Sequence, residues 1–239
     1  MEIVLEKLPK NPTIIEGFPG LGYVSTIAME YLIENLNAKP IGRLWSKKLS
    51  PIAAIHHGEL RRPFEIFYDS KNNLLLLHAI TEVNELEWEI AETILSLAQK
   101  TRTKEIISIE GVNAPFSKTM PKGPFYHSNI PAIEKKFKKL GYTELKEGAV
   151  LGVTGALMLR APKKIPITFV FAQTNTKLPD SRAAAEIIKV LNKYLVLNID
   201  VKPLIKKAER TEEKIKMLLK ESSEGKQLLK KGKELSYLG

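Results

Sequence analysis

The sequence has no cysteine among its 239 residues. This absence excludes a disulfide framework, a thiolate nucleophile and a cysteine-based zinc site. The chain also lacks an apolar run of the roughly 18 to 20 residues that a membrane-spanning helix needs. Its first residues, Met1-Glu2-Ile3-Val4, differ from the basic and then apolar start of a secretory signal. We therefore expect a cytoplasmic protein with no membrane partner.

Arginine and aspartate are scarce beside lysine and glutamate. The chain has 30 Lys and 7 Arg, and 24 Glu and 3 Asp, a bias that is typical of thermophile surfaces. The formal net charge is +10. Three observations argue against a nucleic-acid partner. Arginines are sparse, the aromatic residues do not alternate with the basic runs, and no recognition motif is found.

Half of the excess positive charge lies near the C-terminus. From Lys202 onward there are 11 Lys or Arg against 6 Asp or Glu, a net +5. Such a segment can be attracted to an acidic partner, or it can be a solvated helix kept soluble by lysines. Both interpretations stay open at this point.

Apolar periodicity predicts an α/β sandwich with a largely parallel or mixed sheet. The expected strands are 13–15, 40–45, 52–57, 64–68, 74–80, 104–109, 149–153 and 165–172. The expected helices are 24–36, 84–100, 131–140, 156–159 and 182–195, the last capped by Asp180 or Ser181. Residues 111–130 are expected to form a loop or short hairpin.

The C-terminal segment has a different pattern. A narrow apolar seam follows Pro203, and its residues are Leu204, Ala208, Thr211, Ile215 and Leu218. So narrow a seam must pack on the domain or on another copy of the chain. We therefore predict an α/β core domain over 1–201 and a basic helical extension over 202–239.

A glycine-rich loop connects the first long strand and helix. Gly17, Gly20 and Gly22 form a G-x-x-G-x-G pattern, which is neither the dinucleotide fingerprint nor a P-loop. Its backbone N–H groups could hold an anion, because the loop precedes a helix N-terminus. The alternative is a tight turn that needs small residues for close packing.

No catalytic motif is found, and we expect neither an enzyme nor a cofactor or metal. The histidines, His56, His57, His78 and His127, lack the spacing of a metalloprotease pair, and we expect them to be structural. Glu82, Glu85 and Glu87 follow the predicted strand that ends near Ile80 and lie around the start of the next predicted helix, where acidic residues favour the helix dipole. None of the serines lies in a G-x-S-x-G elbow.

Four segments in order resemble the proteasome assembly chaperone family, in the branch named for its second chaperone subunit. They are the loop Gly17-Phe18-Pro19-Gly20-Leu21-Gly22-Tyr23-Val24, the strand end Ile109-Glu110-Gly111, the turn Gly152-Val153-Thr154-Gly155-Ala156-Leu157, and Pro179 to Ala185 followed by Leu197 to Val201. The likeness covers about 1–201, and the extension resembles that of archaeal members.

The resemblance implies a three-layer α/β/α sandwich similar to nucleoside-phosphorylase-type folds, a homo-oligomer, and a role in proteasome assembly or activation. Some proteins that dock on the outer α ring of the 20S proteasome end in hydrophobic-Tyr-any residue. Here the candidate docking residues are Leu235, Tyr237, Leu238 and Gly239, with tyrosine third from last and preceded by serine. The register therefore departs from that pattern, and these residues could instead attach the extension to the domain.

Three hypotheses remain from the sequence. The first is a proteasome-binding chaperone or activator that works as a homo-oligomer and docks through its C-terminal segment. The second is a small-ligand-binding protein or enzyme that uses the Gly17–Gly22 loop as an anion site. The third is a scaffold that assembles with a paralogous partner.

Overall fold

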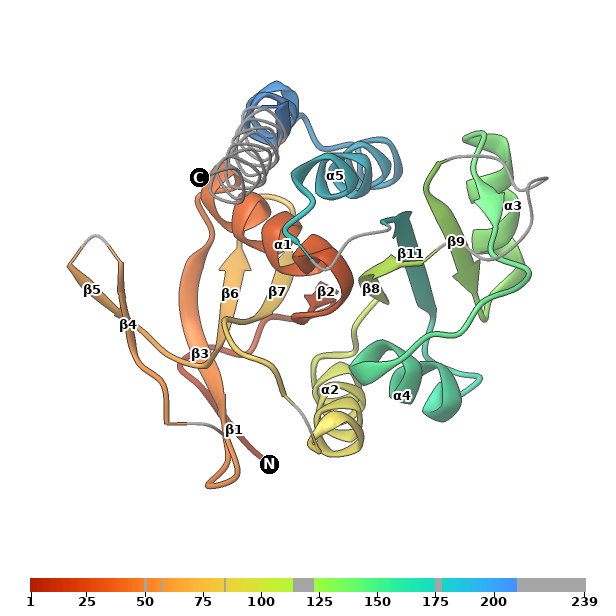
Figure 1. Ribbon diagram of the computed structural model, residues 1–239. Coiled ribbons are helices and arrows are strands. Elements are labelled where there is room, and N and C mark those ends of the chain that lie inside the picture. Colours follow the sequence, from red (N-terminus) through yellow and green to blue (C-terminus); the bar gives the residue numbers. More distant parts are fainter. Residues whose placement is uncertain (50, 57, 84, 114–122, 175–177, 210–239) are drawn as a thin grey trace, which may run out of the picture.

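The computed structural model describes residues 1–209 except 50, 57, 84, 114–122 and 175–177. Its main sheet has the strand order β1-β3-β6-β7-β2-β8-β11-β9-β10 within these residues (Figure 1). The strands of this sheet are β1 (Glu2–Leu5), β2 (Thr13–Gly17), β3 (Lys39–Trp45), β6 (Phe64–Asp69), β7 (Leu74–Ala79), β8 (Glu105–Val112), β9 (Phe125–Ser128), β10 (Thr143–Glu144) and β11 (Ile167–Gln173). A separate hairpin consists of β4 (Ala54–His56) and β5 (Glu59–Arg61).

The centre of the sheet is parallel. Strands β7, β2, β8 and β11 run in the same direction, whereas β1, β3 and β6 form an antiparallel edge and β9 is antiparallel to β11. The central strands are almost completely buried, as expected for parallel strands that are covered on both faces. The predicted mixed sheet is confirmed.

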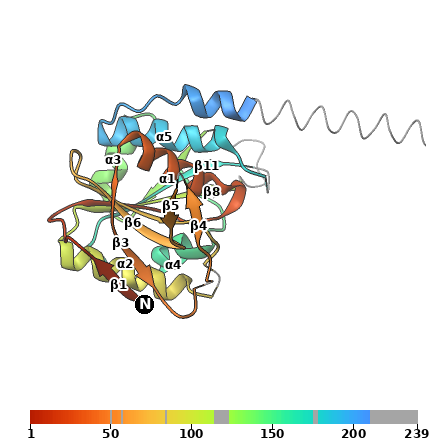
Figure 2. The same ribbon diagram turned by 90° about the vertical axis from the view of Figure 1, so that its left-hand side faces the viewer.

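Helices cover both faces of the sheet. They are α1 (Val24–Asn35), α2 (Glu87–Thr101), α3 (Pro131–Lys139), α4 (Gly152–Arg160) and α5 (Ser181–Leu195), with a short 3-10 helix at Leu21–Tyr23. One core lies between the sheet and α2 and α4, and the other between the sheet and α1 and α5 (Figures 1 and 2). Alternate residues serve the two cores, with Ile14 in the first and Ile15 in the second. The three-layer α/β/α arrangement is therefore confirmed.

The strand predicted at 149–153 is wrong. Residues 148–151 form no strand, and α4 begins at Gly152, whose φ of 67° belongs to the left-handed region. A short apolar run is ambiguous between strand and buried helix, which explains the error. The strand expected over 52–57 is only β4, and it joins β5 rather than the main sheet. The short strands β1, β5, β9 and β10 were not predicted.

The extension begins on the domain. Residues 202–209 are helical and lie on the outer side of α1 and α5 (Figure 2). Leu204 and Ala208 are buried, and Leu204 belongs to the core that includes residues of α1 and α5. The Tyr31 hydroxyl donates to the carbonyl of Asp200 at 2.6 Å, which fixes the chain just before this helix. The rest of the predicted seam, Thr211, Ile215 and Leu218, lies outside the described residues. None of the helices in the described part of the chain is long and apolar enough to cross a membrane.

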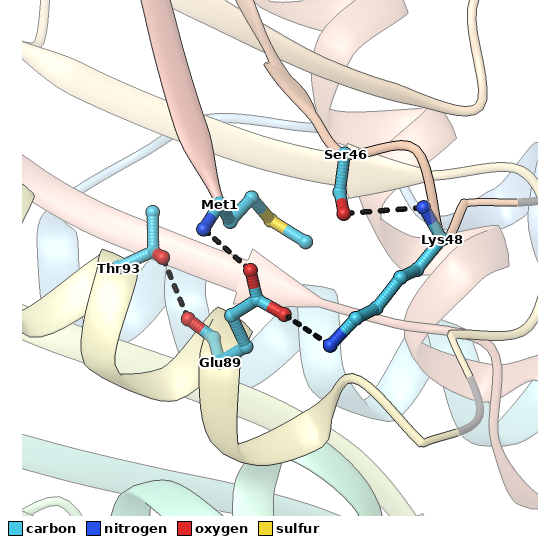
Figure 3. Close-up of polar contacts among 5 residues, drawn as sticks. All are labelled: Met1, Ser46, Lys48, Glu89 and Thr93. Atoms are coloured by element: carbon cyan, nitrogen blue, oxygen red, sulfur yellow. Dashed lines mark hydrogen bonds and ion pairs between the residues drawn. The ribbon is translucent and has the colours of Figure 1, made fainter.

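An ion-pair cluster joins three segments on the α2 side of the sheet (Figure 3). Glu89 of α2 accepts from the amine of Met1 at 2.5 Å, and its other oxygen lies 3.6 Å from Lys48 Nζ. Contact with the Met1 amine lowers the pKa of Glu89, to which Lys48 also contributes. The cluster holds the loop after β3 against the start of α2.

Candidate functional site

A cleft of about 820 Å³ opens at the carboxyl end of the parallel strands. This edge is where open α/β sheets place their ligands. The glycine-rich loop, the end of β8 and the start of α4 form its walls. The lining includes Phe18, Pro19, Gly20, Leu21, Val83, Glu87, residues 110–113 and residues 147–153.

Two carboxyl groups lie on the α4 side of the sheet beside this cleft. Glu16 is the fourth residue of β2, and its Cα partner on β8 is Ser108, two residues before Glu110. Side chains at i and i+2 of a strand share a face, so Ser108 and Glu110 project toward the same helix layer. Glu16 is 0% exposed, whereas Glu110 is partly exposed and lines the cleft.

Burial raises the pKa of both carboxyl groups to about 8. For Glu16 the neighbouring Glu110 raises it further, and Ser108 offsets part of the increase. Neither oxygen of Glu16 has a hydrogen-bond partner among the described residues. For Glu110, the bonds from Gly111 N–H at 3.1 Å and Thr154 Oγ1 at 3.3 Å lower the pKa against the dominant effect of burial. Both groups are therefore mainly protonated at neutral pH.

A chain of hydroxyl groups leads to Glu110. Ser108 Oγ donates to Thr154 Oγ1 at 3.1 Å, and Thr154 in turn donates to Glu110 Oε2. A serine nucleophile needs a base that accepts its proton, but this serine donates to a threonine. The arrangement therefore provides hydrogen-bond donors and acceptors at the cleft rather than a nucleophile paired with a base.

The predicted loop glycines are in tightly packed positions. A Cβ on Gly17 would lie 2.8 Å from Met29 Cγ and 2.9 Å from Ile109 Cγ1. A Cβ on Gly20 would lie 2.3 Å from Glu110 Oε1, and Gly22 has a φ of 65°. These contacts favour the interpretation of the loop as a tight turn. They also place a carboxyl group, not a cation, against Gly20.

The described histidines do not come together. His78 is buried in β7, and burial lowers its pKa to about 4, so it is neutral although Glu30 Oε1 lies 3.8 Å from Nε2. His127 in β9 stacks on Phe169. Among the residues that the structure describes, no group of three or more His, Cys, Asp or Glu side chains is placed to hold a metal ion.

A second buried polar cluster lies at the opposite end of the strands. Glu105, the first residue of β8, accepts from the Tyr194 hydroxyl at 2.8 Å and from the Thr168 hydroxyl. Burial raises the pKa of Glu105 and also that of Tyr194. Lys136 Nζ lies 3.9 Å from the centroid of the Tyr194 ring. All polar groups here have partners, so we assign the cluster to joining α5 to the sheet.

The predicted docking residues, Leu235, Tyr237, Leu238 and Gly239, lie outside the described residues, and so their role stays a prediction. The acidic pair was not predicted as a site. A signal was available, because Glu16 and Glu110 each interrupt an apolar strand immediately before a glycine. The sequence alone did not show that these two strands are neighbours.

Comparison with known proteins decides the family. The model of the PAC2 family matches residues 14–219, which include the glycine-rich loop, both acidic residues and α4. The chain belongs to the PAC2 family. The resemblance to proteasome assembly chaperones is therefore confirmed at the level of the family. A relative from Methanocaldococcus jannaschii, described as uncharacterized, is 30% identical over 215 residues, covering 87% of this chain and 86% of the relative.

Solved structures of the same fold cover nearly the whole chain. Pyrococcus furiosus PbaA, an archaeal homolog of proteasome-assembly chaperone, is 30% identical with a TM-score of 0.84, over 98% of this chain and 99% of PbaA. Pyrococcus furiosus PbaB, an archaeal proteasome activator, is 24% identical with a TM-score of 0.75, over 91% of this chain and 98% of PbaB. The PbaB match supports the fold alone.

Proposed function

We propose that this PAC2 protein is a proteasome-binding chaperone or activator that acts as a homo-oligomer and docks on the α ring of the 20S proteasome through its C-terminal segment. The observation that carries this proposal is the end-to-end similarity to PbaA at 30% identity. Membership of a chaperone-type family also favours binding over catalysis as the activity of this chain.

The start of the extension supports docking through the segment that follows. Leu204 and Ala208 attach residues 202–209 to the domain at the layer formed by α1 and α5. The sequence from residue 210 onward contains much of the local excess of lysine, and its last five residues are Leu235, Ser236, Tyr237, Leu238 and Gly239. An aromatic anchor near a free carboxyl terminus can fill a pocket on a partner, and several copies in one oligomer increase avidity.

Pull-down of purified archaeal 20S proteasome tests the proposal. The full chain is expected to retain the proteasome, and a chain lacking residues 235–239 is expected to lose most of it. Tyr237→Ala should weaken binding, whereas the matched control Tyr23→Ala, at a tyrosine that is 41% exposed outside the extension, should not. Equal retention by the full and truncated chains would refute docking through the C-terminus. No retention by the full chain would refute proteasome binding.

The position of the tyrosine can be tested separately. Deletion of Gly239 together with Ser236→Leu would place tyrosine second from last and after a hydrophobic residue. If the tyrosine enters a pocket together with the terminal carboxylate, this variant should bind more tightly than the natural chain. Hydrolysis of a fluorogenic peptide by the 20S proteasome then distinguishes an activator, which raises the rate, from an assembly chaperone, which leaves it unchanged.

The cleft supports a second candidate, which is binding of a small ligand next to the Gly17–Gly22 loop. Its volume of about 820 Å³ suits a small molecule. Thermal-shift measurements with inorganic phosphate, nucleosides and nucleotides test this function. Glu110→Gln is the better probe, because it preserves side-chain shape, whereas a larger residue at Gly20 would displace the Glu110 carboxyl group. A saturable shift that Glu110→Gln changes would support the candidate.

A further inference from the structure

The charged side chains that line the cleft are all acidic within the described part of the chain. Glu87 comes from the start of α2, Glu110 from β8 and Glu147 from the loop before α4, and no lysine, arginine or histidine accompanies them there. Lys48 lines a neighbouring pocket, but it is already paired with Glu89 at 3.6 Å. The chain as a whole has a net charge of +10. An acidic cleft in so basic a protein indicates a site that favours cations.

A buried carboxyl group without a hydrogen-bond partner lies next to this acidic lining. Glu16 follows Ile14 by two residues in β2, and Ile14 belongs to the core on the α2 and α4 side, so Glu16 projects toward that side. Phe18, two residues further on, lines the cleft. Glu16 is 0% exposed, and neither of its oxygens has a partner among the described residues. Buried polar groups normally have one, and a cation bound beside Glu110 would stabilise this carboxyl group in its ionised form.

The same geometry opposes an anion at the glycine-rich loop. A Cβ on Gly20 would lie 2.3 Å from Glu110 Oε1, and this oxygen already accepts from Gly111 N–H at 3.1 Å. The N-terminus of α4 also borders the cleft at Gly152, and a helix N-terminus favours negative charge. Glu110 Oε2 accepts from Thr154 in the first turn of α4. Glu110 therefore stands where an anionic ligand would have to bind.

The lining favours an organic cation over a metal ion. Among the described residues, no group of three or more His, Cys, Asp or Glu side chains is placed to hold a metal ion. Much of the remaining lining is apolar and includes Phe18, Leu21, Val83, Val112 and Val150. The volume of about 820 Å³ suits a small organic molecule. An amine on an apolar chain matches both features, because its ammonium group donates to carboxylates and its chain covers apolar walls.

We propose that the cleft binds small organic amines, with the ammonium group bonded to Glu110 beside Glu16 and the apolar chain along the wall that includes Phe18 and Val112. The proposal rests on the small-ligand candidate of the proposed function and names its ligand class. Binding ionises Glu110: the ammonium group keeps its proton, and the carboxyl proton passes to the solvent. Because burial raises the pKa of Glu110 to about 8, this ionisation weakens apparent binding at pH 7 by about tenfold.

Calorimetry of the full chain with three six-carbon probes tests recognition of the ammonium group. Hexylamine, hexanol and hexanoate share an apolar chain and differ in the charge of the head group. At pH 8 hexylamine is expected to bind saturably and about tenfold more tightly than hexanol, and hexanoate is expected to bind least. Glu110→Gln should remove the advantage of hexylamine and leave hexanol unchanged. Glu34→Gln, at an exposed position on α1 outside the cleft, is the matched control and should change none of the three affinities.

Proton release provides a second measurement, and it needs no variant. Titration of hexylamine in buffers of different ionisation enthalpy counts the protons released, and about one per amine is expected from Glu110 at pH 7. The affinity should rise about fivefold from pH 7 to pH 8, because more of Glu110 is then ionised while the amine stays charged. The other acidic groups at the cleft are Glu16, Glu87 and Glu147, and Glu16→Gln separates the protons released by the buried neighbour. Binding without proton release at pH 7 would mean that the ammonium group does not meet Glu110.

The outcomes distinguish this proposal from the proposed function. Hexylamine that binds no more tightly than hexanol, or that keeps its advantage in Glu110→Gln, would overturn the amine site. Tighter binding of hexanoate, inorganic phosphate or nucleotides would also overturn it, although the cleft would remain a small-ligand site. If none of these probes binds, the amine site and the small-ligand candidate are both wrong. Retention of 20S proteasome is measured independently of all these results. If Glu110→Gln fails to unfold cooperatively, proton release by the natural chain decides.

Discussion

The replacement Glu16→Gln should stabilise the protein at neutral and alkaline pH. The variant preserves the shape of the side chain but removes an ionisable group that is 0% exposed. Folding raises the pKa of this carboxyl group from 4.5 to about 8. At about 1.4 kcal/mol per pKa unit, the fully ionised group costs the folded state about 5 kcal/mol above pH 8. At pH 7 the cost is about 3 kcal/mol, because the native state still holds most of its proton.

The direction of the pH dependence follows from the raised pKa. The folded protein binds a proton that the unfolded chain releases above pH 4.5, so this contribution to stability is fully present below pH 4.5. It falls as the pH rises toward 8 and does not change further at higher pH. Urea unfolding of Glu16→Gln and of the natural chain, followed by circular dichroism at pH 5, 6, 7 and 8, measures this pH dependence of stability. The stability of Glu16→Gln relative to the natural chain should rise by about 3 kcal/mol from pH 5 to pH 8.

Glu34→Gln, at an exposed position on α1, is the control for replacing a carboxyl group by an amide as such. A difference between Glu16→Gln and the natural chain that stays constant from pH 5 to pH 8 would refute the reasoning. It would mean that Glu16 ionises equally in the folded and the unfolded states. Glu110→Gln should show the same trend, because burial raises the pKa of Glu110 to about 8 as well.

Three further predictions concern how the elements are held together. Gly111→Ala should lower stability by about 1 to 3 kcal/mol, because its Cβ would lie 2.3 Å from the Leu21 carbonyl oxygen, and an unchanged melting temperature would contradict this close approach. Tyr194→Phe should lower the free energy of unfolding by about 1 to 3 kcal/mol, because it removes a donor to buried Glu105. Tyr68→Phe, whose partner Asn73 is nearer the surface, should lower it less in the same urea titration. Leu204→Ala should lower the free energy of unfolding by about 2 to 5 kcal/mol and speed amide exchange in residues 202–209. Ile205→Ala, at a partly buried position, should have a smaller effect on both the stability and the exchange rate.

The sequence predicted most of the central layer of the fold. Strands such as β8 have β-branched runs, and helices such as α5 have a clear period and a capping residue, Asp180, which accepts from Ala183 N–H at 2.9 Å. These signals are local and therefore readable from the sequence. The start of α4 was not predicted, because the run from Ala149 to Val153 is equally apolar in a strand and in a buried helix.

The candidate site was only partly predictable. The tight turn at Gly17, Gly20 and Gly22 follows from the type of residue, and the structure gives each of these glycines a close neighbour. The acidic pair depends on β2 and β8 being neighbours, although much of the chain lies between them in sequence. This is long-range topology, which periodicity does not reveal.

Retention of 20S proteasome by the full chain is the measurement that tests the central claim most directly. The account predicts that the natural chain retains assembled proteasome and that the chain without residues 235–239 retains much less under the same conditions. If the folded, full-length chain retained no proteasome, the proposed function would be contradicted, whatever the outcome for its self-association or for the cleft.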